Sequence, residues 1–421
     1  MSSEDNTLLD ENAVRDLEKI GKADILIGIP SFNNARTIGQ VVRAVSAGLA
    51  KYFREAHAVI VNSDGGSTDG TCEVVESTEF TALDKLMVRH RLHPVHKIIT
   101  PYHGMPGKGS AFRTIFKIAQ LLDVKACAVF DSDLRSITPE WVELLAGPIL
   151  KQGYDYTAPL YRRHKYDGTI TNSIVYPVTR AVYGKRIRQP IGGDFGFSGK
   201  LAASYLAKDV WDSDVARYGI DIWMTTTALA EGFKVCQAYL GAKIHDPKDP
   251  SSDLSAMLMQ VVSSVFGLMD TYYEVWRGIR GSEPVPSFGF EYSVGLDPVH
   301  VNTERMIEHF RHAVRELDVV WKDILEASSL ARVRALADSR RHFFPNDLWA
   351  AVVYDFALAY HHRVMNPEHL MKSLTPLYLG RTASFVLETE EASSDEVELR
   401  VEELAVAFEA KKDRLLAGWM R

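Results

Sequence analysis

The sequence has few cysteines, and they are scattered. Cys72, Cys127 and Cys236 are the only three among 421 residues, and no CxxC pair occurs. Neither a disulfide framework nor a zinc site built on paired cysteines is therefore predicted. Isolated cysteines are typical of a protein that keeps them reduced, so we expect a cytoplasmic location.

A long uninterrupted apolar run is also missing. The longest candidate, AMLMQVVSSVFGLMDTYY from Ala256, is broken by Gln260, Ser263, Ser264 and Asp270. It falls short of the roughly 20 apolar residues that span a bilayer. The acidic N-terminal segment lacks the apolar core of a signal peptide. We therefore expect a soluble protein without a membrane span.

Positive charge is not in excess, since the formal net charge is −7. Such a balance gives no reason to expect a nucleic-acid partner. The hydrophobic content of 46% is that of a globular protein and excludes a disordered chain. A Walker A phosphate loop, G-x-x-x-x-G-K-[ST], is absent.

In the first half of the chain, short apolar runs alternate with helical periodicity. Strands are predicted at 24–30, 57–64, 96–100 and 126–131, and helices at 35–53 and 109–122. This alternation predicts an α/β fold with a parallel, doubly wound sheet. The strand ends are rich in glycine and polar residues, as a ligand site beyond the carboxyl edge of such a sheet requires.

The second half is predominantly helical. The best helix candidates are 252–279, 303–328, 345–363 and 394–417. A Pro/Gly-rich stretch at 280–300 suggests a boundary. We predict an N-terminal helical extension (1–22), a sheet domain (23–280) and a helical C-terminal domain (281–421). The C-terminal helices are expected to complete a ligand pocket and a homodimer surface, and an interaction module is the alternative that helical periodicity leaves open.

The stretch FDSDL runs a predicted buried strand into two acids, Asp131 and Asp133, on either side of Ser132. Residues two apart in a strand share a face, so both carboxylates are able to converge. Mg²⁺ or Mn²⁺ prefers such oxygen ligands and bridges them to phosphates. The same letters also suit a turn or a helix cap, and the motif alone leaves both interpretations open.

Glycine-rich turns accompany further candidate ligand contacts. In MPGKGS, Lys108 precedes a predicted helix, where backbone N–H groups and the ammonium group attract a diphosphate. In QPIGGDFG, Gly192 and Gly193 let the backbone approach a ligand, and Asp194 is able to accept hydroxyl hydrogen bonds. Ordinary turns remain the alternative for both stretches.

Three later features carry charge. Asp221 lies in an apolar helical setting, where it is either a cap or a pocket carboxylate. His245 follows a predicted strand in a loop that is able to supply a further metal ligand. The basic run at 162–165 suits an anionic partner or a solvated surface.

Taken in order, the segments IPSFNN, PGKG, DSD, QPIGG, YGID and AKIH followed by DLSAM resemble a known enzyme family. They are similar to the retaining GT-A glycosyltransferases of the mannosylglycerate, glucosylglycerate and glucosyl-3-phosphoglycerate synthase type. The resemblance covers roughly residues 24–260, and it is weaker in the C-terminal helices. It implies a GT-A fold, with a mixed, mostly parallel Rossmann-like sheet.

The resemblance also implies residue roles. Metal ligands would be Asp133 and His245, holding Mg²⁺ or Mn²⁺. The acids near the transferred sugar would be Asp194 and Asp221. The donor would be held by Pro30, Phe32, Asn33, Asp64, Lys108, Asp131, Ser132 and Gly193. The small anionic acceptor would meet Arg163, Lys165 and Thr169.

The resemblance implies transfer of glucose or mannose from a UDP- or GDP-linked donor to the 2-hydroxyl of D-glycerate, or alternatively of 3-phosphoglycerate. Two segments depart from the family pattern. The first loop reads NNAR where the family often has NEE, and the second reads NSDGGSTDG instead of DDGSTDG. Both concern nucleotide recognition, so the base stays open. A non-catalytic nucleotide-sugar-binding protein is the alternative of another class.

Overall fold

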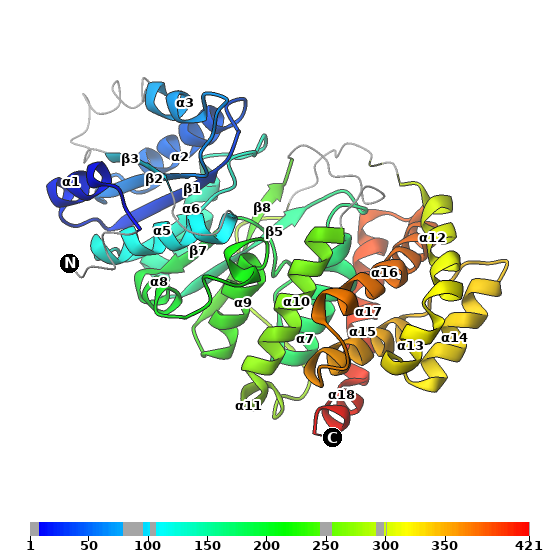
Figure 1. Cartoon of the computed structure of the whole chain (residues 1–421). Coiled ribbons are helices and arrows are strands. Elements are labelled where there is room, and N and C mark those ends of the chain that lie inside the picture. Colours follow the sequence, from blue (N-terminus) through cyan, green and yellow to red (C-terminus); the bar gives the residue numbers. More distant parts are fainter. Residues whose placement is uncertain are drawn as a thin grey trace. The chain divides into compact units, whose positions relative to one another are not determined.

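The computed structural model describes residues 8–78, 96–101, 107–244, 255–291, 299 and 301–420. Its contacts divide the chain into two compact units (Figure 1). The first unit comprises 1–162, 191–246 and 285–295, and the second comprises 163–190, 247–284 and 296–421. The sequence predicted one boundary near residue 280, whereas the contacts assign 163–190 to the second unit.

The first unit contains an eight-stranded sheet in the order β10-β8-β5-β7-β4-β1-β2-β3. The strands are β1 Ile25–Ser31, β2 Ala58–Asp64, β3 His96–Pro101, β4 Ala126–Val129, β5 Tyr156–Arg162, β7 Phe195–Ser198, β8 Val235–Ala242 and β10 Ser287–Phe288. All neighbours pair in parallel except β7, which is antiparallel to β4 and β5. The predicted α/β class with a mixed, mostly parallel sheet is confirmed.

Helices cover both faces of this sheet. The helices α2 Ile38–Tyr52 and α6 Glu140–Gln152 pack together on one face, and α5 Lys108–Leu121 and α8 Gly199–Leu206 on the other. Each strand of the pair β1 and β2 is buried along its whole length, which explains its continuous apolar sequence. The predicted N-terminal helix is α1, Glu11–Ile20, and Asp10 caps it by accepting from the amide of Ala13.

Strand direction decides which residues meet at the carboxyl edge of the sheet. The parallel strands β1, β2, β4, β5 and β8 all end there. Because β7 runs the opposite way, its first residue, Phe195, lies at the same edge. The order along the sheet reverses at β1, which lies between β2 and β4. Ligands of doubly wound sheets bind outside such a reversal point.

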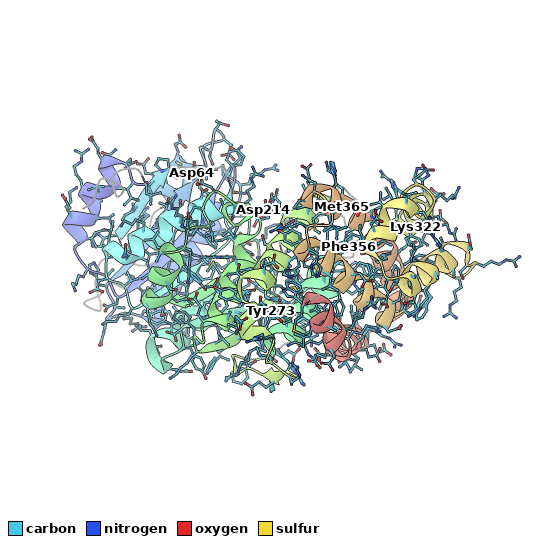
Figure 2. All side chains as sticks on the ribbon, turned by 60° about the horizontal axis from the view of Figure 1, so that its bottom comes forward. Asp64, Asp214, Tyr273, Lys322, Phe356 and Met365 are labelled. Carbon is cyan, nitrogen blue, oxygen red and sulfur yellow. The ribbon has the colours of Figure 1, made fainter. Side chains whose placement is uncertain are left out.

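The second unit is mostly helical. Its elements are η2 Thr171–Val175, α7 Tyr176–Tyr183, α10 Ser255–Thr271, α11 Tyr273–Trp276, α12 Thr303–Glu316, α13 Asp318–Ile324, α14 Ala327–Asp338, α15 Asn346–His361, α16 Pro367–Thr389, α17 Ser394–Ala410, α18 Lys412–Trp419, and the short pair β6 Lys185–Arg186 and β9 Glu283–Pro284. Trp321, Trp349 and Phe356, the last labelled in Figure 2, are fully buried in it. No helix in the described part of the chain is long and apolar enough to cross a membrane.

Candidate active site

The carboxyl edge of the sheet gathers most of the charged residues singled out from the sequence. Asp131 follows β4, and Asp194 immediately precedes β7. Lys108 opens α5, and Asp221 lies in the first turn of α9, Ile220–Ala230. The strand order therefore brings together four residues that are up to 113 positions apart, the separation of Lys108 and Asp221.

Lys108 holds two of these acids. Its Nζ lies 2.7 Å from Oδ1 of Asp131 and 3.3 Å from Oδ1 of Asp221. It also donates to the carbonyl oxygen of Gly193 at 3.3 Å. The contact with Asp221 is an ion pair without hydrogen-bond geometry, because that oxygen is buried and finds no donor among the described residues. The buried Oδ1 of Asp221 therefore has the charge of Lys108 as its described partner.

Lys243 is a site residue that sequence reasoning missed. Its Nζ lies 2.7 Å from Oδ2 of Asp131, 2.7 Å from Oδ2 of Asp194 and 2.7 Å from the carbonyl oxygen of Gly192. The side chain is only 4% exposed. The signal in AKIH is a lysine directly after an apolar strand. His245, two residues later, was instead singled out from the sequence as a metal ligand.

Asp194 orients the other groups. It has no exposed surface, and its Oδ1 accepts from the amide of Asp131 at 2.8 Å. Its Oδ2 accepts from Lys243 and from the hydroxyl of Tyr161. Asp194 thus holds the backbone of Asp131 and the ammonium group of Lys243 in place.

The charges in this cluster stabilise one another. Burial acts to raise the pKa of Asp131, but Lys108 and Lys243 hold it well below its usual range. Burial acts to lower the pKa of Lys108, yet Asp131 and Asp221 hold it above its usual value. Burial raises the pKa of Asp194, against the opposing effect of Lys243. The ionised forms of Lys108 and Asp131 therefore persist across the neutral pH range.

Glycines make this arrangement sterically possible. Gly193 has φ of +86°, and an added Cβ would lie 2.0 Å from Oδ2 of Asp131. A Cβ at Gly107 would lie 2.4 Å from the carbonyl oxygen of Ala216. The glycines around Lys108 thus serve close backbone packing against η3, Asp214–Ala216, in addition to any contact with a ligand.

Replacing Gly109 with alanine is expected to lower the free energy of unfolding by about 1–3 kcal/mol. The new methyl group would lie 2.0 Å from the carbonyl oxygen of Val215, so the start of α5 must shift. Chemical denaturation measures the loss. Gly278→Ala is the control, because its added Cβ meets nothing within 4 Å. Equal stability of the two variants would contradict the close approach of α5 and η3.

A second polar network lies at the ends of β1 and β2. Asp64, labelled in Figure 2, is the last residue of β2 and is 5% exposed. Its carboxylate accepts from the hydroxyls of Ser31 and Ser67, each at 2.7 Å, and from the amides of Gly66 and Ser67. Burial acts to raise the pKa of Asp64, but these donors lower it below its usual value. Asp64 thus orders the loop that follows β2.

The loop after β1 is held in the same network. The amide of Asn33, at φ of +54°, donates to Ser67 Oγ at 2.8 Å. The hydroxyl of Ser132 donates to Asn34 Oδ1 at 2.8 Å, which connects this loop to the DSD segment. Pro30 is buried within β1, whereas Phe32 is 60% exposed. The loop therefore presents an aromatic face beside a rigid polar frame.

Asp133 differs from its neighbour two residues earlier. Its side chain is partly exposed, and among the described residues its carboxylate has no hydrogen bond or ion pair. Asp131, in contrast, already bonds two lysines. His245, the other predicted metal ligand, lies outside the described residues. Among the residues that the structure describes, no three His, Cys, Asp or Glu side chains are grouped so that they could hold a metal ion. Asp133 is thus the carboxylate whose described environment suits a cation.

The three residues predicted to bind the acceptor belong to the second unit. Arg163 Nη1 lies 3.8 Å from Oδ2 of Asp167. Lys165 Nζ donates to the carbonyl oxygens of Thr389 and Glu390, where it caps the end of α16. Thr169 shares a 2.5 Å hydrogen bond with the hydroxyl of Tyr378. Each of the three therefore has partners within that unit.

Comparison with known proteins gives relatives of low identity. An uncharacterised protein of Methanocaldococcus jannaschii is 28% identical over 139 residues, which cover 33% of this chain and 47% of that protein. The chain thus spans about half the length of this curated relative.

Two crystal structures of glucosyl-3-phosphoglycerate synthase from Mycobacterium tuberculosis are also similar. The complex with Mn²⁺, UDP and phosphoglyceric acid is 21% identical, covers 61% of this chain and 82% of that chain, and has a TM-score of 0.43. The complex with Mg²⁺ and UDP is 20% identical, covers 61% and 83%, and has a TM-score of 0.43.

The family assignment follows from a match that covers more than half of the chain. The model of the mannosylglycerate synthase GT domain matches residues 34–267. That span contains the charge cluster of Lys108, Asp131, Asp194 and Lys243, and it contains Asp64, Ser67 and Ser132 of the second network. The chain therefore belongs to the family of the mannosylglycerate synthase GT domain.

Proposed function

We propose that this enzyme transfers glucose or mannose, with retention of anomeric configuration, from a nucleoside-diphosphate sugar to the 2-hydroxyl of D-glycerate. The observation that carries the proposal is the cluster of Lys108, Lys243 and Asp131 within the residues that match the family. Two ammonium groups held at the carboxyl edge of a doubly wound sheet suit a diphosphate.

In this proposal the polar network after β1 and β2 holds the nucleoside. Phe32 offers an exposed ring for stacking on a base, and Asn33, Asp64 and Ser132 fix the surrounding loops. Lys108 and Lys243 both bond the carboxylate of Asp131. The role proposed for Asp131 is therefore a contact with the ribose or with the water shell of the metal. Asp221, whose side chain is partly exposed beside Lys108, accepts a hydroxyl hydrogen bond from the sugar.

We further propose that Mg²⁺ or Mn²⁺ is required. Asp133 fits this role because its partly exposed carboxylate lacks a described partner, and His245 is the second proposed ligand. When bound, such an ion neutralises charge that develops on the leaving diphosphate. Lys108 and the amides at the start of α5 act on the same charge.

The chemistry needs no protein nucleophile. The bond between the anomeric carbon and the diphosphate oxygen breaks, and the sugar becomes oxocarbenium-like. The acceptor 2-hydroxyl attacks the same face, and its proton passes to the departing phosphate oxygen. Asp194 and Lys243 keep Asp131 and Gly192 in place while charge moves to the diphosphate. The products are the glycoside and the nucleoside diphosphate.

A matrix of donors and acceptors tests this function. The enzyme with Mg²⁺ or Mn²⁺ is incubated with UDP-glucose, GDP-glucose or GDP-mannose, and with D-glycerate or 3-phosphoglycerate. Product is measured by mass spectrometry, with water as the control acceptor. One pair giving turnover at least about a hundredfold above the water control is expected. Turnover with neither acceptor would contradict the acceptor assignment, and hydrolysis of one donor would still identify the sugar nucleotide.

The second unit carries the proposed acceptor contacts. Of these, Arg163 supplies the positive charge for the carboxylate of D-glycerate, and a phosphate would use the same basic segment at 162–165. Lys165 bonds the carbonyl oxygen of Thr389, and Thr169 bonds the hydroxyl of Tyr378. We therefore propose that these two residues hold the acceptor-binding segment in place. The homodimer and the cytoplasmic location stay predictions.

A further inference from the structure

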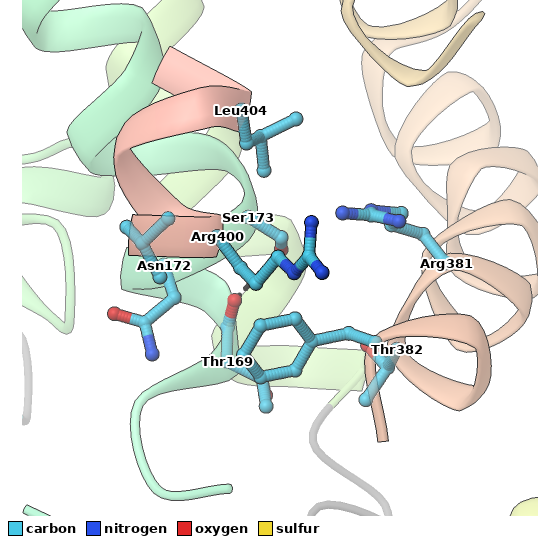
Figure 3. Close-up of a pocket in the computed structure, with 9 residues that line it drawn as sticks. Thr169, Asn172, Ser173, Arg381, Thr382, Arg400 and Leu404 are labelled. Atoms are coloured by element: carbon cyan, nitrogen blue, oxygen red, sulfur yellow. Dashed lines mark hydrogen bonds between the residues drawn. The ribbon is translucent and has the colours of Figure 1, made fainter. Parts of the chain in front are cut away.

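A small pocket lies within the second unit, between α16, α17 and the segment that leads into η2 (Figure 3). It has an empty volume of about 310 Å³, which includes its open mouth. Its polar lining consists of Thr169, Asn172, Ser173, Arg381, Thr382 and Arg400. Phe385, Val401 and Leu404 form the apolar wall, and no acid occurs among these described lining residues.

Arg381 brings a buried charge to this pocket. It is 3% exposed, and its Nη1 and Nη2 donate to the carbonyl oxygen of Phe344 and to Asn346 Oδ1, each at 2.8 Å. Glu388, 3.3 Å from Nη1, offsets part of the charge. The buried Nε finds no acceptor within the described part of the chain. A buried donor without a partner calls for an explanation, and a bound water or ion is one.

A second guanidinium group faces the first. Figure 3 shows the side chains of Arg381 and Arg400 pointing toward one another from α16 and α17. Arg400 pairs with Glu403 at 3.0 Å, on the exposed side of α17. The side chain of Thr382 also lines the pocket, where it interacts with the hydroxyl of Tyr378. Glu388 and Glu403 offset part of the two positive charges, but neither glutamate is among the described residues that line the pocket.

We propose that this pocket binds one small oxyanion, either free phosphate or the carboxylate of a small acid, between Arg381 and Arg400. Planar guanidinium groups recognise such oxygens with short, charge-assisted hydrogen bonds. Thr382 Oγ1 supplies an additional donor from the pocket wall. The site lies apart from the charge cluster at the sheet edge, because every lining residue belongs to the second unit, and it shares only Thr169 with the proposed acceptor contacts.

Isothermal titration with inorganic phosphate, at an ionic strength held constant with sodium chloride, tests the site. Saturable binding of one phosphate per chain is expected. Arg400→Gln is expected to raise the Kd at least about tenfold, and Thr382→Val about threefold or more. Both changes leave the described hydrogen bonds of Arg381 intact.

Arg277→Gln is the matched control, because Arg277 and Glu274 form an exposed ion pair three residues apart in the same unit, as Arg400 and Glu403 do. The control is expected to bind phosphate like the wild type. A parallel titration with acetate distinguishes the two sources of the oxyanion. Absence of binding by both anions, or equal Kd values for wild type, Arg400→Gln and Thr382→Val, would overturn the proposal. The titration reads binding alone, so loss of sugar transfer would not affect its outcome.

Discussion

Replacing Lys243 with methionine is expected to lower the free energy of unfolding by about 3–5 kcal/mol. The substitution removes an ammonium group that bonds Asp131, Asp194 and Gly192 from a position only 4% exposed. Two carboxylates then face each other with less compensation, and the fully buried Asp194 suffers most. Chemical denaturation measures the loss, and hydrogen exchange in β4 and β5 assigns it to the first unit.

Two further variants separate charge from packing. Lys243→Met combined with Asp194→Asn is expected to regain much of the loss, because the uncompensated buried charge is gone. The asparagine oxygen still accepts from the Asp131 amide, and its NH2 group is able to donate to the Tyr161 hydroxyl oxygen. Lys125→Met breaks an exposed pair with Asp24 and should leave stability near the wild-type value. A double variant no more stable than Lys243→Met would show that packing, not charge, accounts for the loss.

The same variant should show a distinct dependence on pH. Burial already raises the pKa of Asp194, and loss of Lys243 raises it further. An acid whose folded pKa lies above its unfolded value of about 3.9 binds an extra proton in the folded state between those values. Its unfolding free energy therefore falls as the pH rises through that window. The deficit of Lys243→Met relative to wild type should be smaller near pH 4 than near pH 7.

Periodicity predicted the sheet unit better than the helical one. The strand at 126–131 is β4, and the strands at 24–30 and 57–64 are β1 and β2, because buried parallel strands carry continuous apolar runs. The helices α14 and α16 were not among the predicted ones. Helix α16 is buried on nearly all sides and contains Pro376, so neither an apolar stripe nor a continuous propensity marks it.

The sequence identified individual site residues, but it could not predict which of them contact one another in the folded protein. The motif reading singled out Lys108, Asp131, Asp194 and Asp221 as polar residues in or near turns. Their convergence depends on β7 running antiparallel between β4 and β5, which no local pattern specifies. Lys243 was missed for the same reason, since its partners lie 112 and 49 residues away. The division of Asp131 and Asp133 into a lysine-held acid and an unpartnered acid likewise needs three-dimensional contacts.

The different surroundings of Asp131 and Asp133 predict a large loss of activity when Asp133 is replaced. Asp133→Asn is expected to lower kcat/KM at least about a hundredfold and to weaken Mn²⁺ binding, because it removes the one carboxylate of the DSD segment that has no described partner. Stability should change little, since no described hydrogen bond is lost. Initial rates over a range of Mn²⁺ concentrations and a direct Mn²⁺ titration by electron paramagnetic resonance measure the two effects.

Asp209→Asn is the matched control, because it removes the same charge from an exposed position after α8. It should leave both the rate and the Mn²⁺ affinity unchanged. Asp131→Asn is expected to act differently: it releases Lys108 and Lys243, so the denaturation midpoint should fall together with the rate. If Asp133→Asn kept the wild-type affinity for Mn²⁺ while Asp131→Asn lost it, the metal ligand would be the acid that the lysines hold, and the assignment of the two acids would be reversed.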